Sequence, residues 1–236
     1  MRVEYFDNYE SMSKRAAEIV AGEVNKKSDM VLGLPTGSTP LGMYAKLIEM
    51  NKCGEVDFSK ITTFNLDEYH PFKKDDVNSY YKFMFDNFFG QINITKENVN
   101  IPDGEAADGD IEAAEYEKRL EACGGLDLMV LGLGANGHIG FNEPDKFLIA
   151  DTHLAELTEG TREQNKRFFN SIDEVPIKAL TMGMGSIMKA KKILIVITGE
   201  AKREAFKQML NGTVTTENPA TFLNLHSDVI VLTDLK

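Results

Sequence analysis

The sequence is poor in cysteine, since Cys53 and Cys123 are the only two among 236 residues. They stand alone, without the paired or closely spaced arrangement of disulfide frameworks and zinc sites. We therefore expect neither a disulfide nor a bound metal. Two unpaired thiols also fit the reducing cytoplasm, which is the location that we predict for the chain.

Long apolar stretches are also missing. The first ten residues, MRVEYFDNYE, lack the basic region followed by an apolar one that marks a secretion signal. Elsewhere no uninterrupted apolar run approaches the roughly 20 residues that a helix needs to cross a bilayer. The sequence therefore predicts no membrane partner.

Cationic side chains are in the minority, because 26 Lys and Arg residues stand against 37 Asp and Glu, with a formal net charge of −11. Nucleic acids and anionic membrane surfaces favour proteins with a basic face. We therefore expect neither of them as a partner. If the substrate carries a phosphate, a few local cations must bind it.

What the sequence does contain is a series of short runs rich in Val, Ile and Leu. Most lack strict polar and apolar alternation, which is typical of strands buried on both faces of a parallel sheet. With 42% hydrophobic residues, the chain can form one sizeable core. The predicted strands are Met30–Leu34, Ile61–Leu66, Leu126–Leu131, Lys192–Ile197 and Val229–Leu232.

Helical segments alternate with these strands. Thr39 is the expected N-cap of one helix with Pro40 in its first turn, and Asn211-Gly212 is expected to end another. The alternation predicts an α/β fold over residues 1–236, with one open, doubly wound, mostly parallel Rossmann-like sheet and helices on both faces. The predicted helices are Ser13–Val24, Pro40–Met50, Asp110–Ala122 and Ala201–Leu210.

The segment LPTGSTP follows the first predicted strand, at the end where ligands bind in such sheets. Gly37 lets the backbone approach a ligand, Ser38 and Thr39 add hydroxyls, and a helix start favours an anion. The glycine spacing is not that of a Walker A loop, and no Lys follows Gly37. An ordinary strand-to-helix turn has the same composition, so this alternative stays open.

The segment FNLDEY places Asp67 and Glu68 just past the second predicted strand. A carboxylate in a partly dry cleft can accept a proton from carbon, so one of the two is a candidate general base. Adjacent residues tend to point in different directions, which argues against a symmetric pair. The alternative is a solvated pair of acids in a loop.

The segment GLGANGHIGFNEP contains a literal G-x-G-x-x-G pattern. A dinucleotide-binding fingerprint needs its last glycine to open a helix, and the residues after Gly137 are poor helix formers. We therefore expect no nucleotide cofactor. His138, with Glu143 nearby, instead forms a candidate proton-transfer pair, in which the carboxylate stabilises the imidazolium. A structural histidine is the alternative.

Together with NSYYKFM and TREQNKRFF, these three segments resemble the glucosamine-6-phosphate deaminase family, in matching order along nearly the whole chain. The related 6-phosphogluconolactonases share the fold and a Gly-His loop, but the FNEP ending and the Asp-Glu-Tyr order favour the deaminases. The resemblance implies reversible conversion of glucosamine 6-phosphate and water into fructose 6-phosphate and ammonia, with no cofactor. A sugar-phosphate sensor is a second alternative, but it would carry a basic DNA-binding segment.

The resemblance implies a catalytic role for four residues. Asp67 takes the proton from C2 of the opened sugar and delivers it to C1, while His138 opens the pyranose ring. Glu143 holds His138. Asn136 stands where some members of the family carry Asp, so Glu143 is expected to be the only anion beside His138.

The resemblance also assigns residues to substrate and phosphate binding. They are Gly37, Ser38, Thr39, Glu68, Tyr80, Arg167 and Lys202. Residues 145–177 resemble the mobile lid of the family. In the family's larger members basic side chains bind an allosteric activator, but Ala150–Leu157 has no Arg or Lys. We therefore expect a monomer without an allosteric activator, and a small sugar phosphate as its ligand.

Overall fold

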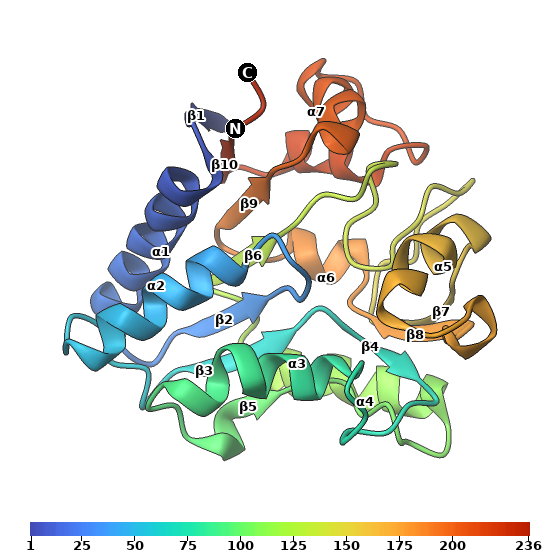
Figure 1. Ribbon diagram of the computed structural model, residues 1–236, viewed down its shortest axis with the longest axis horizontal. Helices are drawn as coiled ribbons and strands as arrows, with labels where there is room; N and C mark the ends of the chain where they lie inside the picture. Colours follow the sequence, from blue (N-terminus) through green and yellow to red (C-terminus); the bar gives the residue numbers. More distant parts are fainter.

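The computed structural model describes all residues from 1 to 236 and contains a central sheet of seven parallel strands, in the order β1-β10-β9-β6-β2-β3-β5 (Figure 1). All five predicted strands are confirmed, whereas the edge strands β1 and β5 were not predicted. The strands are β1 (Arg2–Tyr5), β2 (Val31–Leu34), β3 (Thr62–Asn65), β5 (Val99–Asn100), β6 (Leu128–Leu131), β9 (Ile193–Ile197) and β10 (Val229–Thr233).

Helices cover both faces of this sheet. Leu128 and Val130 of β6 pack in one apolar cluster with α1, α2 and α3, while Met129 and Leu131 pack in a second with α4, α6 and α7. Because alternate residues enter opposite clusters, the strand is buried on both sides, as the unbroken apolar runs predicted. The helices are α1 (Tyr9–Lys26), α2 (Leu41–Lys52), α3 (Tyr80–Asn87), α4 (Gly109–Ala122), α5 (Glu159–Asn165), α6 (Met184–Met188) and α7 (Arg203–Leu210).

The structure also contains six short 3₁₀ helices. They are Phe89–Gln91, Lys96–Asn98, Lys166–Phe168, Ile172–Glu174, Glu200–Lys202 and Pro219–Leu225. The two termini lie close together, because β1 pairs with β10 (Figure 1). No helix in the structure combines the length and the apolar character needed to span a membrane.

The start of α2 differs from the prediction, because Thr39 does not cap the helix. Pro40 occupies the cap position with helical angles, φ −80° and ψ −7°, and no side chain of its own accepts a hydrogen bond there. The Tyr9 hydroxyl of α1 takes over this role, since the Gly42 N–H donates to it at 2.8 Å. The Thr39 hydroxyl is therefore free to face the opposite loop. The end of α7 at Asn211 and Gly212 agrees with the prediction.

A second, antiparallel sheet of three strands was not predicted. It consists of β4 (Asp67–His70), β8 (Lys178–Thr181) and β7 (His153–Glu156), in the order β4-β8-β7. Asp67 pairs with Thr181 and both side chains are buried, so the alternative of a solvated loop is wrong. The sequence DEYH has no apolar alternation, and only the pairing with β8 makes it a strand.

The order of the strands creates a crevice beside β2. From β2 the chain continues to β3 on one side, and it later returns to place β6 on the other side. The loops after β2 and β6 therefore leave the same edge of the sheet next to each other. In open α/β sheets this is the point where ligands bind.

Candidate active site

A pocket of about 890 Å³ opens at this edge of the sheet. Its walls come from the segments that follow β2, β3, β6 and β9, together with the start of α3 and the segment from α5 to Phe169. The strand-end rule thus predicted the place of this pocket. The predicted residues that line it are Gly37, Ser38, Thr39, Asp67, Tyr80, His138, Arg167 and Lys202.

One end of the pocket is suited to an anion. Gly37 has φ of +94°, a backbone conformation that residues other than glycine rarely adopt. The Lys202 ammonium donates to the Thr39 hydroxyl at 3.2 Å, which ties the loop after β9 to the loop after β2. Burial and the nearby charge of Arg167 lower the pKa of Lys202. A bound phosphate would relieve this repulsion between two cations.

A second feature of the pocket is the side chain of Asp67, a buried carboxylate with an oxygen that accepts no hydrogen bond. It is 7% exposed, and its Oδ1 atom has no hydrogen-bond partner. Burial, helped by the charge of Glu68, raises the pKa of Asp67 to about 8. A carboxylate with a raised pKa and a free oxygen is suited to accept a proton.

Two glycines allow close approaches around these groups. Gly140 has φ of +60°, and a Cβ atom there would lie 3.5 Å from Oδ2 of Asp67. A Cβ atom at Gly134 would overlap the imidazole ring of His138. Gly134 therefore makes room for the His138 ring, and Gly140 is required by its backbone conformation, which explains two glycines of a pattern that only superficially matches a nucleotide-binding loop.

His138 and Glu143 lie together, as the sequence predicted. His138 Nδ1 is 3.2 Å from Glu143 Oε1, an ion-pair distance without the geometry of a hydrogen bond, and Asn136 Nδ2 donates to Glu143 Oε2 at 2.7 Å. Burial favours the neutral acid, but the contacts with His138, Thr161 and Asn136 outweigh it and lower the pKa of Glu143 to about 2. Glu143 is thus held as an anion behind His138, outside the pocket lining.

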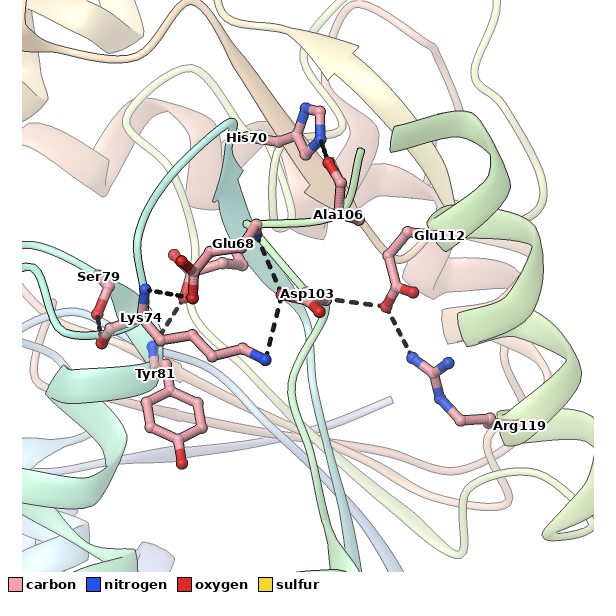
Figure 2. A network of polar contacts seen from close by, with 10 residues as sticks. Glu68, His70, Lys74, Ser79, Tyr81, Asp103, Ala106, Glu112 and Arg119 are labelled. Carbon is pink, nitrogen blue, oxygen red and sulfur yellow. Dashed lines mark hydrogen bonds and ion pairs between the residues drawn. The ribbon is translucent and has the colours of Figure 1, made fainter. Parts of the chain in front are cut away.

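Glu68 does not line the pocket, which corrects its expected contact with the substrate. Its carboxylate accepts the N–H groups of Tyr69, Tyr80 and Tyr81 at 2.9, 3.0 and 2.8 Å. Figure 2 shows it beside the start of α3, near Asp103. The free N–H groups at the start of a helix favour a carboxylate, so Glu68 caps the start of α3 and does not face the ligand.

The structure also explains why Tyr80 lies in the pocket. Glu68 fixes the first turn of α3, and the Tyr80 ring packs 4.8 Å from that of Tyr69 and 6.2 Å from that of Phe141, centroid to centroid. Burial, with the nearby Tyr69 and Asp67, raises the pKa of Tyr80 well above its usual value. Tyr80 is therefore a neutral, rigidly held wall of the site.

Sequence reasoning missed several residues of the site. Thr198 and Gly199 follow β9 and line the pocket, so the strand-end rule was enough to find them. Thr161 opens the TREQNKRFF segment that carries the resemblance, but nothing in that segment indicates its contact with Glu143, which lies outside it. No group of three or more His, Cys, Asp and Glu side chains in the structure is arranged to hold a metal ion.

Comparisons with known proteins agree with this geometry. The family described as "Glucosamine-6-phosphate isomerases/6-phosphogluconolactonase" matches residues 7–232. The glucosamine-6-phosphate deaminase of Thermoanaerobacter pseudethanolicus is 56% identical over 234 residues, covering 99% of this chain and 92% of that protein. The glucosamine-6-phosphate deaminase of Clostridium beijerinckii is 51% identical over 234 residues, covering 99% and 97%.

Solved structures separate the two branches of the family. A monomeric glucosamine-6-phosphate deaminase has a TM-score of 0.97 at 45% identity, covering 100% of this chain and 98% of its own. The 6-phosphogluconolactonase of Thermotoga maritima has a TM-score of 0.76 at 18% identity, covering 98% of both chains. The second similarity extends to the fold alone.

Proposed function

The chain belongs to the family of glucosamine-6-phosphate isomerases and 6-phosphogluconolactonases, and within it we propose that this enzyme converts glucosamine 6-phosphate and water reversibly into fructose 6-phosphate and ammonia. The observation that carries the proposal is the pairing, in one pocket, of a carboxylate suited to carbon chemistry with a separate His-Glu pair. Hydrolysis of a lactone has no use for a carbon base.

The first step is opening of the pyranose ring, which we assign to His138. The imidazole lines the pocket, and the anionic Glu143 stands behind Nδ1. The imidazole can take the proton of the C1 hydroxyl and donate a proton to the ring oxygen as the bond from C1 to that oxygen breaks, which leaves the aldehyde at C1. Glu143 stabilises the imidazolium in this role, and Asn136 fixes the far oxygen of the carboxylate.

The second step is transfer of a proton from C2 to C1, which we assign to Asp67. The aldehyde formed at C1 makes the proton on C2 acidic, and the free oxygen of Asp67 accepts it. Return of the proton to C1, while a proton of the substrate's amino group passes to the oxygen on C1, leaves an imine at C2. Water hydrolyses this imine to the ketone and ammonia. A positively charged amino group on the substrate would favour ionised Asp67, whose pKa burial raises to about 8 in the empty pocket.

The phosphate of the substrate belongs at the cationic end of the pocket. The N–H groups and hydroxyls of the loop from Gly37 to Thr39, with Lys202 and Arg167, supply its donors. These few cations answer the problem posed by the acidic net charge of the chain.

Residues 145–177 act as a lid in this proposal. The segment carries Arg167, Phe168 and Phe169 into the pocket wall, and the Phe169 ring packs 5.9 Å from that of Tyr69. Closure over the substrate would keep bulk water away from the reacting carbons during the proton transfer from C2 to C1.

We also propose that the enzyme is a monomer without an allosteric activator. The similar deaminase of known structure is described as monomeric, and Ala150–Leu157 contains no Arg or Lys that would bind an anionic effector. Cys53 and Cys123 are free thiols, which fits work in the reducing cytoplasm.

The direct test incubates the purified protein with glucosamine 6-phosphate and measures ammonia and fructose 6-phosphate. A parallel assay follows hydrolysis of 6-phosphogluconolactone. We expect both products in equal amounts and no lactone hydrolysis. Lactone hydrolysis without ammonia release would overturn the proposal.

A further inference from the structure

Thr161 joins the lid to the His-Glu pair. It lies in α5, is 5% exposed, and lines the pocket. Its hydroxyl donates to Oε1 of Glu143, the same oxygen that lies 3.2 Å from Nδ1 of His138. We propose that Thr161 is a positioning residue for ring opening, which aims the Glu143 carboxylate at His138 only while α5 is seated against the pocket.

The three partners of Glu143 come from two parts of the fold. His138 and Asn136 belong to the loop that follows β6, the segment that carries Glu143 itself. Thr161 alone comes from the proposed lid. Removal of α5 would therefore leave Oε2 held by Asn136 but release Oε1, the oxygen that faces the imidazole.

The same short segment carries the phosphate-binding cation. Gln164 and Asn165 share the pocket face of α5 with Thr161, and Arg167 follows in the next 3₁₀ helix. Arg162 ties the segment together, because its guanidinium donates to the carbonyls of Ile172 and Val175 at 2.8 and 3.2 Å. A phosphate bound by Arg167 would hold α5 in place. The hydroxyl of Thr161, which lies in α5, would then keep the Glu143 carboxylate in position.

The choice of residue supports a polar role for this position. Threonine is a poor helix former, and a buried hydroxyl without a partner is unfavourable, so helix stability alone does not explain Thr161. Its hydroxyl has a charged acceptor in Glu143. Valine has the same shape without the hydroxyl, and serine keeps the hydroxyl, so the two replacements separate shape from hydrogen bonding.

The first experiment compares Thr161→Val and Thr161→Ser with the unchanged enzyme in the ammonia assay, and it rests on the proposed function. Loss of a hydrogen bond to a charged group corresponds to a fall in kcat of roughly 10-fold for Thr161→Val, with little change in KM. Thr161→Ser should retain most of kcat. A raised KM with unchanged kcat in Thr161→Val, or equal loss in both variants, would overturn the inference.

A matched control lies three residues earlier. The Thr158 hydroxyl caps α5 by accepting the Thr161 N–H at 3.2 Å, but it does not contact Glu143. Thr158→Val therefore removes the cap of the helix and leaves the side chains of Thr161 and Glu143 themselves unchanged. If Thr158→Val lowers kcat as much as Thr161→Val does, the effect belongs to lid packing and the inference is wrong.

A second measurement does not depend on activity. The chain has only four histidines, so the ring nitrogens of His138 can be followed by NMR in protein with ¹⁵N-labelled histidine. We expect the His138 signals to move in Thr161→Val and to stay in place in Thr161→Ser. Unmoved signals in Thr161→Val would refute the positioning role. If the His138 signals move in Thr161→Val but the unchanged enzyme releases no ammonia, the proposed function is refuted instead.

Discussion

Asp67 and Glu143 are two carboxylates at one pocket, and their surroundings drive them in opposite directions. Asp67 is 7% exposed and the Glu143 side chain 9%, so exposure alone does not distinguish them. Asp67 has an unpartnered oxygen and a pKa raised to about 8 by burial and the charge of Glu68. In Glu143, contacts with His138, Thr161 and Asn136 overcome burial and lower the pKa to about 2.

The comparison teaches how a fold assigns different chemistry to the same functional group. Asp67 lies on a strand whose neighbours satisfy only its backbone, so its side chain is left to exchange a proton with the ligand. Glu143 lies in a loop that folds back on itself and meets donors on both oxygens. The partners of each carboxylate, more than its exposure, decide whether it acts as a base or as a fixed anion.

The largest expected effect follows removal of the base. Asp67→Asn keeps the shape of the side chain but cannot take the C2 proton, so kcat should fall by about 10²–10⁴-fold with little change in KM. Steady-state ammonia release checks this. Near-normal turnover in the variant would remove Asp67 from the mechanism.

A smaller loss is expected when the fixed anion is neutralised. Glu143→Gln leaves His138 in the pocket but removes the charge that stabilises its cation, so kcat should fall by roughly 10²-fold. Glu117 provides a matched control, because it is a buried carboxylate that accepts from Ser186 and Thr152 and does not line the pocket. An equal loss of turnover in Glu117→Gln would trace the effect to folding.

The ionised forms of the two carboxylates should change the stability of the fold in opposite directions. The pKa of Asp67 is raised to about 8, so its protonated form stabilises the fold below about pH 4, and this contribution is lost as the pH rises to about 8. The pKa of Glu143 is lowered to about 2, so its contribution is present above about pH 4.5 and is lost as the pH falls through 2.

Thermal unfolding at several pH values tests this prediction. At pH 7, Asp67→Asn should raise Tm and Glu143→Gln should lower it, by roughly 2–4 °C for each kcal/mol. The gain from Asp67→Asn should shrink toward pH 4. Shifts of the same sign in both variants would show that the contrast between the two sites is incorrect.

The smallest expected effect concerns Asn136, which holds the outer oxygen of Glu143. Asn136→Asp places a second negative charge near His138, so we expect the acid limb of the pH–rate profile to move upward. The variant also loses the amide donor at 2.7 Å, so kcat at the optimum should fall modestly. A profile identical to that of the unchanged enzyme would argue against a relay role for this position.

The apolar runs of the sequence were enough to predict the central sheet. Strands such as Leu128–Leu131 are buried on both faces, so continuous hydrophobicity identifies them without knowledge of their neighbours. Edge strands failed this test. Arg2–Tyr5 is partly exposed and mixed in composition, and only its pairing with β10 makes it a strand.

The motifs at the strand ends predicted the place of the pocket and five of the residues that line it, namely Gly37, Ser38, Thr39, Asp67 and His138, because strand order in an open sheet brings those ends together. They did not predict how Glu68 is used. Whether a carboxylate faces the ligand or a helix start depends on the position of α3, which local sequence does not specify.

The sequence by itself determined the five inner strands of the central sheet, the candidate phosphate loop and the identity of the acid and base candidates, since these depend on local composition and on residue type. Only the tertiary structure decided which carboxylate is left without partners, which is held as an anion, and that Thr161 reaches Glu143. The physical reason is that a buried group's protonation depends on the dipoles and charges around it. In this chain the fold decides which of these neighbours reach each carboxylate, including Thr161 of α5 for Glu143.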